Sequence, residues 1–190
     1  RRPPARMGLI GHNRGPSLEP GHAFRRLAWS KARAALMPNL PVEVVRLRVK
    51  RAAELGLDYS TYAGIRASTG QDVIAVLFST NALRMLREGQ GDPVRIAALA
   101  AVRAGRSLAV APPMDAAFVA DDLKIRGLAL DRVMPAPGLL SWPQLRGRID
   151  ALRAGWPADR VLVIGETMAE RDWVQAGRLA GHIPAEKYFA

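Results

Sequence analysis

The sequence predicts an α/β protein in which a small parallel sheet of about three core strands is the middle of three layers, preceded by a helical, basic N-terminal lobe. Three observations predict this fold. Apolar runs of strand length recur in the second part of the chain, segments of helical periodicity separate them, and basic residues gather in the first quarter. Strands that alternate with helices of this length pair in parallel, because each helix carries the chain back to the starting edge.

Residues 1–21 are expected to form a flexible basic arm. Glycines and prolines interrupt residues 8–21, and these residues show no apolar period. The basic start is not followed by the apolar stretch of a secretory signal. The chain also has no cysteine, which fits a reducing compartment, and we expect a cytoplasmic protein.

Residues 22–70 are expected to form the helical basic lobe. Apolar residues line one stripe of a helix over 22–37, and Pro38 ends it. Residues 42–55 fit two structures: Val45, Leu47 and Val49 alternate as in a strand, but the apolar spacing that continues to residue 55 fits a helix. We favour the helix because Gly56 is a natural carboxyl-terminal stop. A second, short helix is expected from residue 60 or 61 to 67.

Residues 71–190 are expected to form the α/β domain. The run 73–78 is continuously apolar, as in a strand that is buried on both faces, and strands at 107–111 and 161–164 complete the expected core. Helix signals separate and follow these strands, and a loop is expected at 135–138. The helices are expected at 82–87, 93–104, 114–123, 141–154 and 168–180.

Composition excludes several kinds of site. The chain has no cysteine, which removes disulfides, thiolate catalysis and cysteine-ligated metals. Its three histidines are scattered, so no metal site is predicted. No apolar run approaches the roughly 18–20 residues of a membrane-spanning helix, and no membrane partner is expected.

A helix-turn-helix is one candidate for nucleic-acid binding. Residues 51–66 resemble this DNA-binding motif, since small Ala52 precedes the turn residue Gly56 and apolar Tyr62 and Ile65 follow on the next helix. Gly64 departs from the pattern, and the second helix offers few base-reading side chains. An ordinary helical hairpin that packs on the sheet is the favoured alternative.

The carboxyl ends of the strands are the candidate active site, because ligands of open parallel sheets bind there. Residues 73–81, an apolar strand that closes in Ser79-Thr80-Asn81, resemble the second motif of the haloacid dehalogenase phosphatase superfamily. Residues 161–167 resemble a glutamate-substituted form of its fourth, metal-binding motif. The resemblance implies phosphoryl transfer with Mg²⁺, phosphate held by Ser79 or Thr80 and metal held by Glu166 or Glu170. No strand ends in the Asp-x-Asp nucleophile of that superfamily, so a structural or degenerate site is favoured.

The uneven charge is the basis of the leading functional hypothesis. Residues 1–51 hold twelve Arg or Lys against Glu19 and Glu43, a net charge of +10 in a chain of net charge +11. Such a segment binds polyanions and releases their counterions. We expect a nucleic-acid-associated binding protein, without a cofactor, rather than an enzyme. The residues expected to contact nucleic acid are Arg25, Arg26, Lys31, Arg33, Arg46, Arg48, Lys50, Arg51, Ser60, Thr61 and Arg66.

Two alternatives stay open. One is a phosphoryl-transfer or nucleotide-processing enzyme with a degenerate haloacid dehalogenase-like site and Mg²⁺. The other is a subunit of a larger assembly, in which an acidic protein partner covers the basic lobe.

The composition is also what a GC-rich genome produces, since Arg outnumbers Lys 24 to 4. That explanation accounts for the residue type better than for its clustering.

Overall fold

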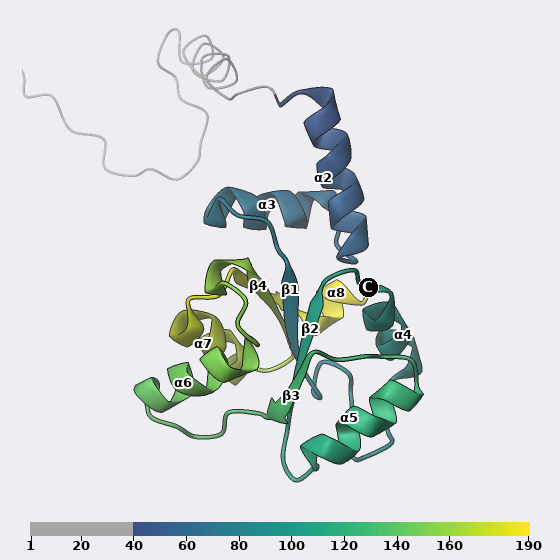
Figure 1. Cartoon of the computed structure of the whole chain (residues 1–190), viewed down its shortest axis with the longest axis vertical. Coiled ribbons are helices and arrows are strands. Elements are labelled where there is room, and N and C mark those ends of the chain that lie inside the picture. The colour runs from purple at the N-terminus through teal and green to yellow at the C-terminus, as the bar shows by residue number, and fades with distance from the viewer. Residues whose placement is uncertain (1–39) are drawn as a thin grey trace, which may run out of the picture. The chain divides into compact units, whose positions relative to one another are not determined.

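A computed structural model describes residues 40–190 (Figure 1). Their centre is a five-stranded, all-parallel sheet of order β3-β2-β1-β4-β5. The strands are β1 (Ala75–Ser79), β2 (Gly105–Val110), β3 (Arg132–Pro135), β4 (Val161–Gly165) and β5 (Gly181–Pro184). The strand order reverses between β1 and β4, and this pair of carboxyl ends is therefore the crevice where ligands of such sheets bind.

Strand β1 forms because its apolar side chains can be buried on both faces of the sheet. All five of its residues are buried. Val76 and Phe78 contribute to one core, and Ala75 and Leu77 contribute to the other, as the two-residue period of a strand requires. Central β1 thus joins two hydrophobic cores that lie on opposite faces.

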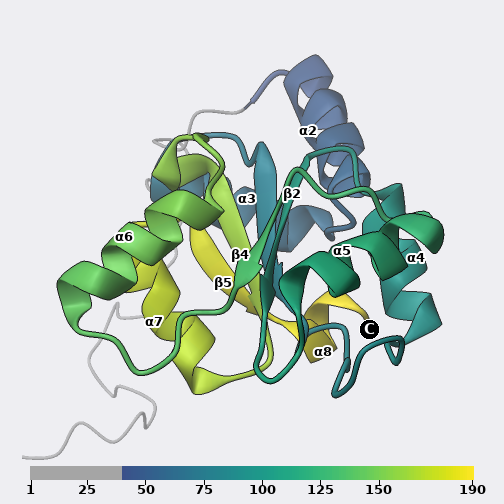
Figure 2. The same ribbon diagram turned by 60° about the horizontal axis from the view of Figure 1, so that its bottom comes forward.

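Helices cover both faces of the sheet (Figures 1 and 2). On one face lie α6 (Trp142–Leu152) and α7 (Met168–Gly177), and on the other lie α4 (Pro93–Ala101), α5 (Ala116–Ile125) and the short α8 (Ala185–Tyr188). The polar residue before several helices caps them. Asp92 and Asp115, for example, accept hydrogen bonds from the first backbone N–H groups of α4 and α5.

Helices α2 (Val42–Glu54) and α3 (Tyr59–Thr69) precede the sheet and share its core. Ala52, Leu55, Leu57 and Tyr62 are buried in the same apolar cluster as Val76 and Phe78. Residues 42–190 accordingly form one compact unit. The expected boundary at residue 70 falls inside this unit, and both helices bury side chains in the same core as the sheet.

The α/β class, the parallel sheet and its helix-covered faces are confirmed, but the number of strands is wrong. Five strands are present instead of three, since β3 and β5 were not expected. The helical lobe is confirmed only in part: residues 42–54 and 59–69 are helical, whereas the expected arm at 1–21 and helix at 22–37 lie outside the described residues. The helix favoured over a strand at 42–55 is confirmed.

The expected helix at 82–87 is wrong, since these residues form turns. Arg84 has a φ of +51°, which interrupts a right-handed helix. Ala82, Leu83 and Met85 are all buried, so the segment folds over to place three nearly consecutive side chains in the core. Within residues 40–190, no helix has the length and apolar character needed to span a membrane.

The turn between α2 and α3 depends on glycine at position 56. Gly56 has a φ of +68°, and a Cβ there would lie 2.8 Å from the Tyr188 hydroxyl. That hydroxyl donates a hydrogen bond of 2.7 Å to the Leu55 carbonyl, and burial raises the pKa of Tyr188 to about 12. Tyr188 therefore holds the turn between α2 and α3 against the C-terminal part of the chain.

Gly56→Ala is expected to lower the free energy of unfolding by about 2 kcal/mol, from left-handed backbone strain and displacement of Tyr188. Urea unfolding measures the loss. In a Tyr188→Phe background the same substitution should cost less, because the obstructing oxygen is gone. An equal cost in both backgrounds would contradict the role given to Tyr188.

Candidate functional site

The first candidate site is the exposed side of α2. This helix contacts the rest of its unit through its carboxyl-terminal turn, where Ala52 is buried and the Glu54 carbonyl accepts a hydrogen bond of 2.8 Å from Arg103 N. Its first two turns are largely exposed (Figure 1). Arg46 and Lys50 are exposed and Arg48 is half-buried.

The basic side chains of α2 are largely uncompensated within residues 40–190: Arg46 and Lys50, four residues apart, share one side of the helix, and Arg48 lies on another. Arg46 and Glu43 form an ion pair at 3.3 Å, but both side chains are more than 70% exposed (73% and 78%), so the pair restrains Arg46 little. Arg48 and Lys50 make no ion pair or side-chain hydrogen bond with any residue between 40 and 190. Among residues 40–190, Glu43 is thus the sole partner of these three cations.

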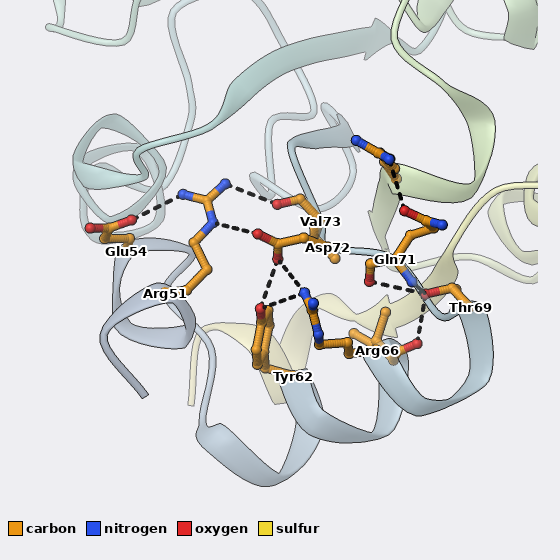
Figure 3. Close-up of polar contacts among 10 residues, drawn as sticks. Arg51, Glu54, Tyr62, Arg66, Thr69, Gln71, Asp72 and Val73 are labelled. Carbon is orange, nitrogen blue, oxygen red and sulfur yellow. Dashed lines mark hydrogen bonds and ion pairs between the residues drawn. The ribbon is translucent and has the colours of Figure 1, made fainter. Parts of the chain in front are cut away.

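Arg51, by contrast, is occupied by structural contacts (Figure 3). Its guanidinium donates to the Val73 carbonyl at 2.9 Å and to the Arg103 carbonyl at 3.0 Å. It also pairs with Glu54 at 3.0 Å and with Asp72 at 3.5 Å. Arg51 therefore joins α2 to the start of β1 and the end of α4, and it is a poor candidate for phosphate contact.

Arg66 and the start of α3 are also engaged. Arg66 lies 3.8 Å from the Asp72 carboxylate and donates to the Tyr62 hydroxyl at 3.5 Å (Figure 3). The Ser60 hydroxyl and Thr61 N donate to the Asp58 carboxylate, and these hydrogen bonds hold the pKa of Asp58 well below its usual range. A carboxylate that stays ionised at the start of α3 repels phosphate.

The helix pair has the turn of a helix-turn-helix but not the reading surface. Exposed positions of α3 are Ser60, Gly64, Ala67 and Ser68, none of which reaches far from the backbone. Major-groove reading needs longer hydrogen-bonding side chains such as Arg, Asn or Gln. The expected contacts at Arg25, Arg26, Lys31 and Arg33 lie outside the described residues.

The second candidate site, at the carboxyl ends of β1 and β4, brings together the expected residues Ser79, Thr80, Glu166 and Glu170. Ser79 and Thr80 are fully buried. Their hydroxyls accept hydrogen bonds from Ala82 N at 3.1 Å and Ala111 N at 2.9 Å, respectively. Both hydroxyls thus fix the loops that leave β1 and β2.

Glu170 is only 1% exposed and holds the start of α7. One carboxylate oxygen accepts from Glu166 N at 2.6 Å and Thr167 N at 2.7 Å, and the other accepts from the Asn81 amide at 3.1 Å. This carboxylate connects the end of β1 to the end of β4. Its two oxygens already satisfy three donors.

Sequence reasoning missed Arg95. It is buried, donates to the Ala82 carbonyl at 2.7 Å and lies 3.5 Å from the Glu166 carboxylate, with its guanidinium 5.0 Å from the Phe189 ring centre. One signal could have revealed it. Arg95 shares the buried stripe of α4 with Ile96 and Leu99, and an arginine on such a stripe needs buried partners.

These contacts do not fit a phosphoryl-transfer site. The central strand ends in Ser79-Thr80-Asn81 without an aspartate, and both hydroxyls are buried. No group of three metal-ligating side chains occurs among residues 40–190. Since Glu170 holds backbone donors and Glu166 faces Arg95, the residues present do not form a Mg²⁺ site. The contacts of Asn81, Glu166, Glu170 and Arg95 instead hold together the loops that follow β1 and β4; we call this group the structural clasp.

His182 lies beside this clasp. Its Nε2 is buried and has no hydrogen-bond partner among the described residues. A Cβ on Gly165 would lie 2.9 Å from that nitrogen and 2.7 Å from a Glu170 oxygen. Burial, and then the nearby Arg171 charge, lower the pKa of His182, while Glu170 opposes the shift. The neutral imidazole is therefore the form favoured by the fold.

Stability is expected to decrease as the pH falls below about 6.5, because the unfolded chain then binds a proton at His182 more readily than the folded chain does. The stabilisation is fully present above that pH and is lost as the pH falls through the folded value. Urea unfolding of wild type and His182→Gln between pH 7.5 and 5.5 measures the effect. The variant should show a shallower pH dependence, and identical slopes would contradict the assignment.

No protein-family model, curated protein or solved structure matches this chain.

Proposed function

We propose that this protein binds nucleic acid through phosphate contacts made by Arg46, Arg48 and Lys50 on α2. The observation that carries the proposal is the state of these cations: all three lie on α2, Arg46 and Lys50 are exposed and Arg48 is half-buried, and within residues 40–190 only Glu43 pairs with any of them. They also continue the basic sequence of residues 1–51, where the net charge is +10. Neighbouring cations on a helix attract the phosphate backbone.

The proposed mode of binding is independent of base sequence. Phosphate contacts position a protein on nucleic acid, whereas base contacts specify the sequence. Helix α3 presents short side chains and the Asp58 carboxylate, so it offers no base reader. Affinity should thus depend strongly on salt and weakly on sequence.

The contacts of Arg51 determine which cations should be replaced to test the proposal. Neutralising Arg51 together with the other three would disturb the fold, because its guanidinium satisfies two backbone carbonyls and Asp72. The informative variant is R46A/R48A/K50A. A matched control is R132A/R148A/R178A, which removes the same charge from three exposed arginines of the α/β body that form no ion pair within residues 40–190.

In fluorescence anisotropy with a labelled 20-bp DNA duplex and an RNA hairpin, R46A/R48A/K50A in the full chain should bind at least about 10-fold more weakly than the control. The slope of log affinity against log salt should fall by about 2 to 3. Thermal melting verifies that both variants remain folded. Equal affinity of the two variants, or no binding by wild type at about 50 mM salt, would reject the proposal.

The two alternative functions make different predictions, and separate measurements test them. A phosphoryl-transfer enzyme would turn over p-nitrophenyl phosphate with Mg²⁺, and the filled hydroxyl and carboxylate contacts at the strand ends lead us to expect no turnover. A subunit whose acidic protein partner covers the basic lobe would elute from size-exclusion chromatography as a larger complex when it is purified from its own host.

A further inference from the structure

Exposed apolar side chains follow the carboxyl ends of four strands. Leu86 follows β1, Phe118 follows β2, Leu140 and Trp142 follow β3, and Met168 follows β4. Leu86 is 77% exposed and Met168 is 71% exposed. The carboxyl ends of parallel strands meet at one edge of a sheet, and exposed apolar side chains at such an edge are typical of a binding surface.

A shallow cavity of about 380 Å³, widely open to solvent, lies at this edge between the loops that leave β1 and β2. The cavity is lined by Leu86, Arg87, Glu88, Pro113 and Met114. Its size lies at the lower end of the range of sites for small organic ligands, about 300–1,000 Å³. It is separate from the exposed side of α2, so it can be tested independently of the proposed nucleic-acid binding.

The two loops that form the cavity are held in place before any ligand binds. The Glu88 carboxylate accepts a hydrogen bond of 2.9 Å from Asp115 N and so joins one loop to the other. Leu83 and Met85 anchor the first loop in the core, and the Leu83 carbonyl accepts a hydrogen bond from Asp92 N at 3.0 Å. The backbone that carries Leu86 and Arg87 is therefore fixed on both sides.

Arg87 gives the cavity its polarity. It is exposed and forms no ion pair or side-chain hydrogen bond with any residue between 40 and 190. Two carboxylates lie nearby and keep their negative charge, but each is oriented by a backbone donor: Glu88 accepts from Asp115 N, and Asp115 accepts from Phe118 N. The cavity therefore combines an apolar wall with one available guanidinium, which suits an oxyanion.

We propose that this cavity binds a small organic anion, with an aromatic or branched apolar body against Leu86, Pro113 and Met114 and a carboxylate, sulfonate or phosphate on Arg87. The thioether of Met114 suits an aromatic ring in particular. The apolar contacts provide affinity and the single cation orients the ligand.

The fluorescent anion 8-anilinonaphthalene-1-sulfonate tests the proposal, with neutral N-phenyl-1-naphthylamine as its uncharged analogue. The folded wild-type protein should enhance the fluorescence of both dyes. Arg87→Ala should weaken sulfonate binding about 5-fold, the equivalent of about 1 kcal/mol, and leave the neutral dye unchanged. Leu86→Ser should weaken both dyes by a similar factor.

Matched controls are Arg132→Ala, which removes an exposed cation from the opposite edge, and Ile125→Ser, which removes an apolar side chain that is 86% exposed outside the cavity. Neither control should change the affinity for either dye. The proposal is overturned if no dye binds to the folded protein, if Leu86→Ser binds as wild type does, or if Arg87→Ala affects both dyes equally. Thermal melting of every variant excludes dye bound to unfolded chains.

Discussion

Glu170→Leu is expected to lower the free energy of unfolding by about 4 kcal/mol. The buried carboxylate accepts hydrogen bonds from Asn81, Glu166 N and Thr167 N. A leucine has a similar size but accepts none, so three donors lose their partner at once. Each unsatisfied donor costs about 1–3 kcal/mol, and water reaches the partly exposed backbone groups in compensation.

Urea unfolding measures this loss, and the dependence of the free energy on urea should stay unchanged if only the folded state is weakened. Glu170→Gln retains one carbonyl acceptor and should lose about half as much. The control Glu186→Leu, at an exposed glutamate, should change stability by less than about 0.5 kcal/mol. If Glu170→Leu resembles this control, Glu170 does not join β1 to β4 as described.

This prediction also bears on function. Sequence reasoning selected Ser79, Thr80, Glu166 and Glu170 because polar residues after parallel strands converge at one edge, and they do converge. Their partners could not be inferred from the sequence, because a serine or glutamate that holds a backbone N–H has the same sequence pattern as one that holds a ligand. The geometry therefore favours a structural role for them.

The limits of the fold prediction have a related cause. Strands β1, β2 and β4 were expected because each is a run of buried apolar residues. The edge strands β3 and β5 carry much weaker signals: Arg132 and Pro135 are exposed at the ends of β3, and β5 contains Gly181 and His182. An edge strand has only one neighbouring strand, so its sequence need not be continuously apolar.

The charged residues between positions 40 and 51 divide in a similar way. Charge counting treats Arg46 and Arg51 as equivalent. Arg46 is exposed on α2, whereas Arg51 donates hydrogen bonds to the backbone carbonyls of Val73 and Arg103. Sequence could not separate them, because three of the four partners of Arg51 lie 21, 22 and 52 residues away in the chain. The structure leaves Arg46, Arg48 and Lys50 as the cations worth testing.

Gly105→Ala is the second substitution with a large expected effect. Gly105 begins β2 opposite Ala75, and a Cβ at this position would lie 2.1 Å from Cζ2 of the Trp156 indole. The ring covers the glycine directly, and Gly105 N donates to the Ile74 carbonyl at 3.0 Å, which fixes the strand. Either the indole or the start of β2 must move when a methyl group is added.

We expect Gly105→Ala to lower the free energy of unfolding by about 3 kcal/mol, at the upper end of the cost of overpacking. Trp156→Leu alone should also destabilise, because the half-buried indole packs against the core that contains Ile149 and Leu152. The double variant is the decisive measurement: once the indole is absent, the added methyl group should cost less than about 1 kcal/mol. Additive losses in the double variant would show that the ring does not constrain position 105.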